Sequence, residues 1–269
     1  MIEPFAIYRY YSLRFNTGTD MRKWIILGIF LFILALLPLC GKSSSDKYYK
    51  VAFDPDWLAL NLVGKAENVS AFSKEIINAL AKAENLSIET LHTGWQVGLP
   101  DLQDASYNAL LTSMTPSSED KERYVFSDPY LNIGDVVVTR INEDIMQLSD
   151  LEGKIIAIWP DSLPLIKLEE FPSIVFVKYS KQEEVLQKLI HEEVDGVLMG
   201  LIPAYTVCNN LYYGQLKVAT DTLDNRSLKF MLFKNEDHEA FVDKINSGLQ
   251  KIRDDGTYHQ LLKKWKLKQ

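Results

Sequence analysis

The sequence predicts an α/β protein of 269 residues. That length suits one large domain or two lobes of about 100 residues each. Short apolar runs at 49–53, 109–111 and 136–139 are typical of buried strands. Between them lie segments with apolar residues at helical spacing, such as the stretch from Phe72 to Ala83. The apolar stripe of that helix indicates core packing rather than a cofactor site.

The helix ends carry their own signals. Ser70 is expected to cap the helix that contains Phe72, and Asn85 is expected to end it. Near the C-terminus, Thr257 with Gln260 three residues later predicts a capping box for the last helix.

Composition excludes several classes of function. The hydrophobic fraction of 47% and the charged fraction of 24% are ordinary for a globular chain. A net charge of −7 and an isoelectric point near 5.2 argue against a nucleic-acid partner, which would demand a basic face. The four histidines and two cysteines show no ligand spacing, so neither a metal nor another cofactor is expected. Cys208 lacks a histidine nearby in sequence and is expected to be a buried, small hydrophobic residue.

The N-terminal region indicates export. Arg22 and Lys23 precede residues 24–39, a stretch of sixteen residues without a charge. A membrane span needs about 20 apolar residues, so this stretch suits the core of an export signal. Met21 is an alternative start, since residues 1–20 do not look like part of a signal.

Cys40 follows the apolar stretch in a context that resembles a lipobox, in which a cysteine receives a diacylglyceride. Leu39 departs from that pattern, because a small residue normally stands there, and an uncleaved N-terminal anchor is the alternative. Residues 41–47 are polar and serine-rich and read as a tether. Residues 1–40 are therefore expected to be an N-terminal extension and lipoprotein-type signal peptide.

A run of motifs in the middle of the chain resembles a known family. After the strand at 109–111 come a polar loop, the sequence Phe-Ser-Asp-Pro-Tyr at 126–130 and the strand at 136–139. In order and spacing this resembles the bacterial extracellular solute-binding proteins of the polar amino-acid type, the glutamine-, arginine- and histidine-binding group. Three further segments match motifs of that family. They are the start of the second lobe at 148–158, the strand at 194–199 and the ending Gly-Thr-Tyr-His-Gln-Leu-Leu-Lys-Lys-Trp. The resemblance spans 48–265.

The resemblance implies a periplasmic-binding-protein fold, in which two α/β lobes are joined by two hinge strands. Lobe 1 would comprise 48–134 and 224–269, and lobe 2 would comprise 135–223. A solute would bind in the cleft between them and favour hinge closure.

In the first lobe the resemblance assigns ligand contacts to Asp54, Trp57, Trp95, Ser113 and Thr115. The two tryptophans would offer flat aromatic surfaces to the solute. For Trp57 the alternative is a surface residue that covers the core, and the sequence does not decide between the two.

The charged anchors of the family are missing at their aligned positions. The family's arginine, which grips the α-carboxylate of the solute, aligns with Asp120, whose charge would repel that carboxylate. Arg123 is a possible substitute, and an exposed helical face is the alternative interpretation of both residues. The family's aspartate, which pairs with the α-ammonium, aligns with Gly200. The anchors are therefore expected to have been replaced, unless the alignment is shifted or the protein binds only weakly.

In the second lobe the family has a glycine-rich turn that binds the carboxylate through backbone N–H groups. Here the turn contains Trp159, Asp161 and Ser162, and Pro160 and Pro164 each remove a donor. Trp159 would form an aromatic wall. A cationic group of the solute could face Asp54, Asp120 or Asp161.

The resemblance implies the substrate-binding lipoprotein of an ABC importer, outside the inner membrane and anchored to a membrane. Its partners would be a small polar solute, an ABC permease and the membrane, and the protein would be a monomer. Two alternatives remain: an exported dehydratase-type enzyme, which needs a general acid in the cleft, and a sensor or interaction module that has lost transport. A permease gene beside this one would favour transport.

Overall fold

The structure of this chain is a computed structural model. It describes residues 48–53, 62, 64–92, 102, 104, 106–145, 147–160 and 170–267. The chain divides into two compact units, Met1–Asp46 and Lys47–Gln269, and all described residues belong to the second. Our expectations for the leader, the tether and Cys40 therefore lie outside the described residues.

The first sheet is built from the two ends of this unit. Its strands are β1 (Tyr48–Phe53), β2 (Ser87–His92), β3 (Ala109–Thr112), β4 (Tyr124–Phe126), β5 (Leu131–Asn132) and β11 (Ser227–Phe233). The order is β2-β1-β3-β11-β4, with β5 also paired to β11. Strand β1 runs parallel to β2 and β3, whereas β11 returns from the far end of the sequence and runs antiparallel to its neighbours.

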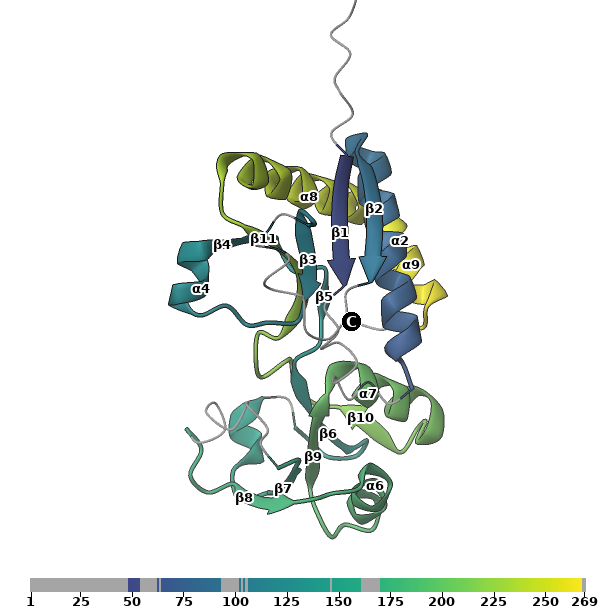
Figure 1. The fold of residues 1–269 in the computed structure, drawn as a ribbon. Coiled ribbons are helices and arrows are strands. Elements are labelled where there is room, and N and C mark those ends of the chain that lie inside the picture. The colour runs from purple at the N-terminus through teal and green to yellow at the C-terminus, as the bar shows by residue number, and fades with distance from the viewer. Residues whose placement is uncertain are drawn as a thin grey trace, which may run out of the picture. The chain divides into compact units, whose positions relative to one another are not determined.

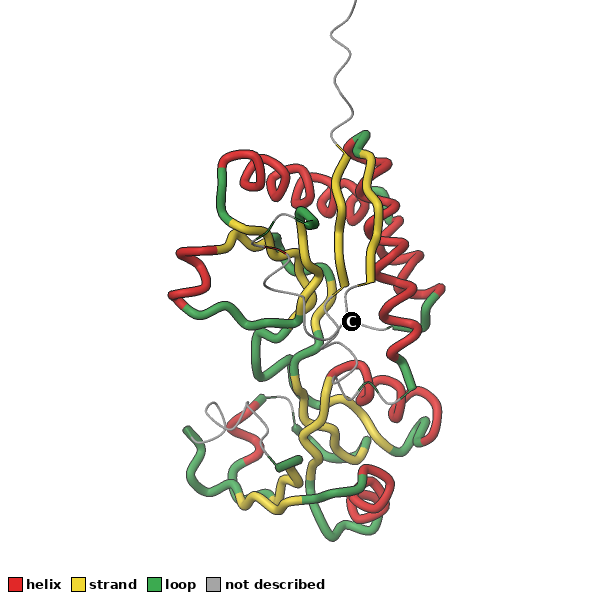
Figure 2. The backbone as a smooth tube through the Cα atoms, in the orientation of Figure 1, coloured by secondary structure: helices red, strands yellow, loops and turns green. Residues whose placement is uncertain are grey.

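Helices cover one face of this sheet. They are α2 (Ala66–Glu84), α8 (Glu236–Asp254) and α9 (Thr257–Lys264) (Figure 1). Figure 2 shows the long helices in red beside the yellow strands. The core between helices and sheet contains Phe72, Phe230 and Phe241, and a smaller cluster on the opposite face contains Leu110 and Met231. We call this sheet with its helices the first lobe; the lobe also carries the short exposed helix α4 (Ser118–Arg123).

The expected start of α2 was wrong, and its expected end is confirmed. The helix begins at Ala66 after the N-cap Lys65, so Ser70 lies inside it and cannot cap it. Asn85 ends the helix in the left-handed conformation, with φ of 51°, and its N–H donates to carbonyls of the last turn. Asparagine tolerates this conformation better than most residues, which explains why it marks the end.

The capping box expected for α9 was also wrong. Gly256 is the N-cap, with φ of 81°, and Thr257 is already the first helical residue. The N–H of Thr257 donates to Asp255 Oδ1 at 2.8 Å, so an aspartate two residues upstream satisfies a donor of the first turn.

The second sheet is formed by the middle of the unit. Its strands are β6 (Asp135–Arg140), β7 (Ile155–Ile158), β8 (Val175–Lys178), β9 (Gly196–Gly200) and β10 (Leu216–Val218), in the order β10-β6-β9-β7-β8. The other elements are the 3₁₀ turn η2 (Leu148–Leu151), α6 (Gln182–Ile190), α7 (Leu201–Thr206) and the π-helical turn η3 (Val207–Leu211). We call this group the second lobe. Apolar clusters on both faces of the sheet bury its central strands β6, β9 and β7, whereas the edge strand β8 is mostly exposed.

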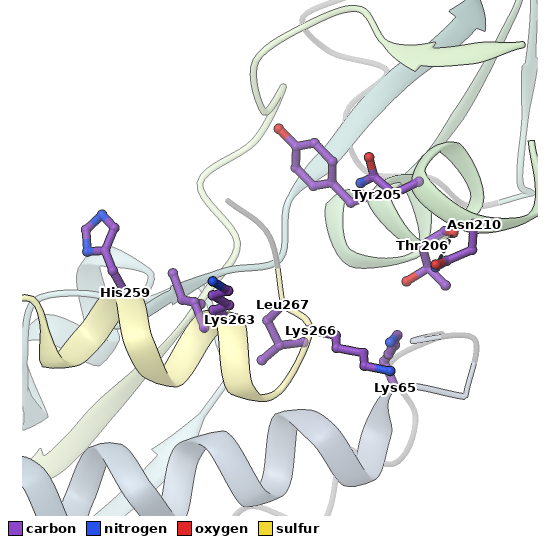
Figure 3. Close-up of a pocket in the computed structure, with 10 residues that line it drawn as sticks. Lys65, Tyr205, Thr206, Asn210, His259, Lys263, Lys266 and Leu267 are labelled. Atoms are coloured by element: carbon purple, nitrogen blue, oxygen red, sulfur yellow. Dashed lines mark hydrogen bonds between the residues drawn. The ribbon is translucent and has the colours of Figure 1, made fainter. Parts of the chain in front are cut away.

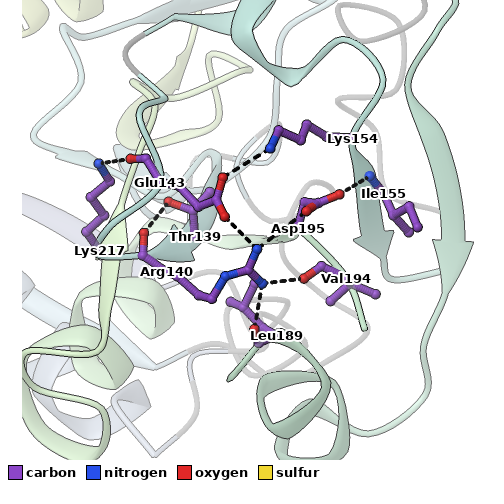
Figure 4. Close-up of polar contacts among 9 residues, drawn as sticks. All are labelled: Thr139, Arg140, Glu143, Lys154, Ile155, Leu189, Val194, Asp195 and Lys217. Carbon is purple, nitrogen blue, oxygen red and sulfur yellow. Dashed lines mark hydrogen bonds and ion pairs between the residues drawn. The ribbon is translucent and has the colours of Figure 1, made fainter. Parts of the chain in front are cut away.

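One arginine ties several elements of the second lobe together (Figure 4). Arg140, at the end of β6, donates to the carbonyls of Leu189 and Val194, both at 2.8 Å. Its guanidinium also pairs with Glu143 at 2.6 Å and with Asp195 at 3.4 Å. Lys154 approaches the other oxygen of Glu143 at 3.1 Å. This network joins β6, α6 and the segments before β7 and β9.

Cys208 is buried in the second lobe, as expected, and burial raises the pKa of its thiol to about 11. Such a thiol is protonated and unreactive at neutral pH. Among the helices that the structure describes, none is both long and apolar enough to cross a membrane.

Candidate functional site

Two chain crossings connect the lobes, and they lie side by side. The first leads from β5 into β6, and the second leads from β10 back to β11. The N–H of Leu223 donates to the carbonyl of Asp135 at 2.8 Å, and the N–H of Ile133 donates to the carbonyl of Arg226 at 3.0 Å. The crossings are therefore linked through their backbones where the chain passes between lobes.

A cluster of charged side chains lies at this junction. Arg226 contacts Asp135 at 2.5 Å and donates to both oxygens of Asp224, at 3.0 and 3.1 Å. Asp224 also accepts the N–H groups of Asp135 and Arg226, at 3.0 and 2.8 Å. With both carboxyls ionised, this hinge cluster of Asp135, Asp224 and Arg226 carries one net negative charge.

The pKa values of the two carboxyls in the hinge cluster are shifted in opposite directions. Burial raises the pKa of Asp135 in spite of the nearby Arg226 charge. Burial also acts to raise the pKa of Asp224, but the hydrogen bonds from Arg226 and from two backbone N–H groups outweigh it and lower that pKa. Asp224 is therefore the firmly ionised partner of Arg226, and Asp135 is the carboxyl whose charge is less well compensated.

Asp135 lies directly opposite Gly200 in the ladder between β6 and β9. A Cβ atom built on Gly200 would lie 3.8 Å from Asp135 Oδ1. Gly200 stands where the family has an aspartate, and the carboxylate of Asp135 comes from the neighbouring strand to almost the same place.

An aromatic pair, Trp159 and Tyr179, lies near Asp135. Trp159, directly after β7, is 42% exposed and contacts Tyr179 edge to face, with ring centres 5.5 Å apart. Tyr179 donates its hydroxyl to the carbonyl of Leu198 at 3.2 Å. Burial, followed by the negative charge of Asp135, raises the pKa of Tyr179 to about 12, so its hydroxyl remains a donor at neutral pH.

In the first lobe, the loop after β3 holds Ser113 and Thr115. The N–H of Met114 donates to Thr112 Oγ1 at 3.1 Å, which fixes the start of the loop. The carbonyl of Met114 accepts a hydrogen bond from the ammonium of Lys229 at 3.3 Å. A cation thus lies at the loop that the resemblance assigns to the solute.

Asp120 and Arg123 lie on the exposed helix α4. Ser117 is its N-cap and forms a capping box with Asp120, whose carboxylate accepts from the hydroxyl and the N–H of Ser117 at 2.6 and 2.9 Å. These hydrogen bonds lower the pKa of Asp120. Arg123 pairs with Glu119 at 3.1 Å, and both side chains are mostly exposed. These contacts belong to a solvated helix, and a role for either residue in binding stays a prediction.

Several predicted site residues fall outside the described residues. They are Asp54, Trp57, Trp95, Asp161 and Ser162. Across the part of the chain that is described, no three His, Cys, Asp or Glu side chains gather in a way that could hold a metal ion.

A separate cavity of about 480 Å³ has two walls (Figure 3). One wall is formed by α7 and η3, and the other by the C-terminal helix α9. Its described lining includes Lys65, Lys263 and Lys266 and contains no carboxylate. Tyr205 and Asn210 lie on the opposite wall, which belongs to the second lobe. The groove is therefore basic in a chain of net charge −7.

Comparison with known families decides the assignment. The sequence matches the bacterial extracellular solute-binding proteins, family 3, over residues 49–268. The chain belongs to this family. The match covers every described strand except the first residue of β1.

The chain is also similar to curated proteins that are named for binding amino acids. The chain is 24% identical over 260 residues to a probable histidine-binding protein of Neisseria gonorrhoeae, covering 91% of this chain and 96% of the relative. It is 25% identical over 255 residues to the arginine-binding extracellular protein ArtP of Bacillus subtilis, covering 91% and 98%.

Solved structures confirm the two-lobed α/β fold. The unliganded, open L-cystine solute receptor of N. gonorrhoeae superposes with a TM-score of 0.65 at 17% identity, covering 82% of this chain and 93% of the receptor. A polar amino acid ABC uptake transporter substrate-binding protein from Streptococcus thermophilus gives a TM-score of 0.64 at 19% identity, covering 82% and 86%. At this level of identity the likeness shows the fold alone.

Our reading of the sequence missed the charged residues that the structure places at the junction and the loop. Asp135, Arg226 and Lys229 were not among the predicted site residues. A signal was present, because Asp135 begins the run Val136-Val137-Val138 and Lys229 interrupts an otherwise apolar strand. A charge inside a buried strand is uncommon unless it is paired, and therefore indicates a partner or a function.

Proposed function

We propose that this chain is the solute-capturing component of an ABC importer and that its solute is a small polar molecule of the amino-acid type. Membership of family 3 over nearly the whole body supports this, as do the relatives named for binding histidine and arginine. In sheets with parallel strands, ligands bind outside the carboxyl ends. The loop after β3 and the residues Trp159 and Gly200 all lie at such ends.

The observation that carries the proposal is the position of Asp135 opposite Gly200. A cationic group of the solute would meet this carboxylate where the aligned aspartate is missing. The negative net charge of the hinge cluster favours such a group, and the exposed indole of Trp159 would add a cation–π surface. The zwitterion anchors have then been replaced rather than lost.

We further propose where the protein works. The body works on the outer side of the inner membrane, held there by a lipid on Cys40 or by an uncleaved leader. When solute binds both lobes, its higher affinity for the closed state shifts the hinge equilibrium. An ABC permease then receives the solute from the closed form.

A solute screen tests this function. The full chain in detergent would be melted with amino acids, amines, short peptides, polyamines and organic acids, and unfolding would be followed by tryptophan fluorescence. A ligand that binds only the folded state stabilises it by about 2.7 kcal/mol at a hundredfold excess over Kd, which raises the melting temperature. If no solute across the panel raises it, the capture function is wrong.

A variant makes the screen specific to Asp135. Asp135→Asn keeps the size of the side chain and removes its charge, so cationic solutes should bind about tenfold to a hundredfold more weakly. Asp221→Asn on the other crossing, between β10 and β11, removes an exposed carboxylate and serves as the control. Equal affinity of the wild type and Asp135→Asn for cationic solutes would contradict the assignment. Conversion of a bound solute into product would favour the dehydratase alternative.

A further inference from the structure

Lys229 occupies an unusual position in the first lobe. It lies in β11, where Leu228 and Phe230 face the core beneath the helices. Alternation along the strand therefore turns Lys229 to the opposite face, which it shares with Met231. Its partner across the ladder is Thr112, the last residue of β3. This places Lys229 at the carboxyl edge of the sheet, beside the loop of Ser113 and Thr115.

The charge of Lys229 is poorly compensated. The residue is 7% exposed, and among the described residues its ammonium has a single hydrogen bond, the 3.3 Å bond to the carbonyl of Met114. Within the described residues, no carboxylate lies within ion-pair distance of it. Burial, assisted by the positive charge of Lys121, lowers its pKa. Burying a cation without a counter-ion costs free energy, so a lysine in this place suggests an anionic partner from outside the chain.

We infer that Lys229 holds the carboxylate of the solute and replaces the arginine that is absent at residue 120. This inference rests on the proposed function and adds to it the residue that holds the carboxylate of the solute. Ser113 and Thr115 flank Met114 in the sequence, so their hydroxyls are further candidate donors in the same loop. A lysine ammonium is a compact charge with three donors, so it can keep its bond to Met114 and bind a carboxylate as well.

Matched pairs of solutes test the inference. L-arginine and agmatine differ by the carboxylate alone, and so do L-histidine and histamine. Titration of the full chain in detergent, followed by tryptophan fluorescence, should show that the wild type prefers the acid in at least one pair. Lys229→Met should reduce that preference by about tenfold to a hundredfold, because it removes a charge-assisted hydrogen bond. Lys229→Arg, which keeps the charge, should retain part of it.

The control variant is Lys121→Met, which removes a nearby exposed cation from α4 and should leave the preference unchanged. If Lys229→Met keeps the wild-type preference, the inference is wrong. The inference is also wrong if Lys121→Met abolishes the preference as completely as Lys229→Met does, since a diffuse positive field would then explain the preference.

A measurement without solute separates this inference from the proposed function. If Lys229 lacks a counter-ion within the chain, Lys229→Met should melt at the same or a higher temperature than the wild type. Loss of the single bond to the Met114 carbonyl costs only the net free energy of one hydrogen bond. A fall in melting temperature larger than this loss explains would show that the ammonium pairs with a carboxylate of the chain, and would overturn the inference. A wild type that binds none of the four solutes, with Lys229→Met more stable, would count against the proposed solutes and would still support an anion site at Lys229.

Discussion

At the scale of single residues, opposite charges lie at the starts of two strands that belong to different sheets. Asp135 begins β6, and Lys229 is the third residue of β11. Each is followed along its strand by apolar residues, and neither occupies the position that the family alignment assigns to an anchor. If the proposals above hold, Asp135 replaces the missing carboxylate from the strand beside Gly200, and Lys229 replaces the missing cation from β11.

The same scale gives a prediction about pH. Hydrogen bonds from Arg140 and then Lys154 lower the pKa of Glu143. A carboxyl with a lowered pKa in the folded state contributes stability above its unfolded pKa of about 4.3, and loses it as pH falls through the folded value. Glu143→Gln should therefore lower the free energy of unfolding by about 1–3 kcal/mol at pH 7. Below pH about 3 the difference from the wild type should shrink. Urea unfolding at both pH values measures this.

The matched control for that prediction is Glu119→Gln. Glu119 pairs with Arg123, but its side chain is 75% exposed, so the pair is screened by water and its loss should change stability little. If Glu143→Gln destabilised the protein equally at both pH values, lost packing rather than lost charge would be the cause.

At the scale of elements, the two crossings depend on close approach at Gly134. A Cβ atom there would lie 2.7 Å from the carbonyl oxygen of Asp224 and 2.9 Å from its Oδ1. Gly134→Ala should push the crossings apart and destabilise the protein by about 1–3 kcal/mol. Gly200→Ala is the control, because its nearest neighbour would be Pro203 at 3.5 Å, an ordinary contact. Urea unfolding of both variants measures the difference, and equal stability would contradict the close packing.

The elements also show what the sequence could predict. The apolar runs correctly predicted β1, β3 and β6, because burial on both faces leaves a continuous hydrophobic signal. The helix starts predicted at Ser70 and Thr257 were wrong, because α2 already begins at Ala66 and Gly256 is the N-cap of α9, neither with a side-chain cap that the sequence would signal. Helix α7 and the π-helical turn after it were missed altogether.

The site was harder to predict than the fold. The pairing of Asp135 with Gly200, and of Lys229 with Thr112, depends on the registers of strands far apart in sequence. Alignment to a family motif identifies the position that lost a charge. It does not identify the neighbouring strand that supplies one, because that depends on the three-dimensional ladder.

At the scale of the whole molecule, the two charges belong to different lobes. Lys229 is part of the first sheet and Asp135 is part of the second. A zwitterionic solute that binds both would link the lobes, whereas a simple amine would contact Asp135 alone. A ligand shifts a hinge only by its differential affinity for the closed state, so the zwitterion should close the lobes more completely.

Small-angle X-ray scattering tests this difference on the full chain in detergent, with the detergent contrast-matched. Saturating L-arginine or L-histidine should reduce the radius of gyration of the wild type, and agmatine or histamine at saturation should reduce it less. Lys229→Met should respond to the acid and to the amine alike, because neither can then bridge the lobes. If the amines close the wild type as fully as the amino acids do, the lobes are not held together through the carboxylate, and closure must come from contacts to the second lobe and the hinge.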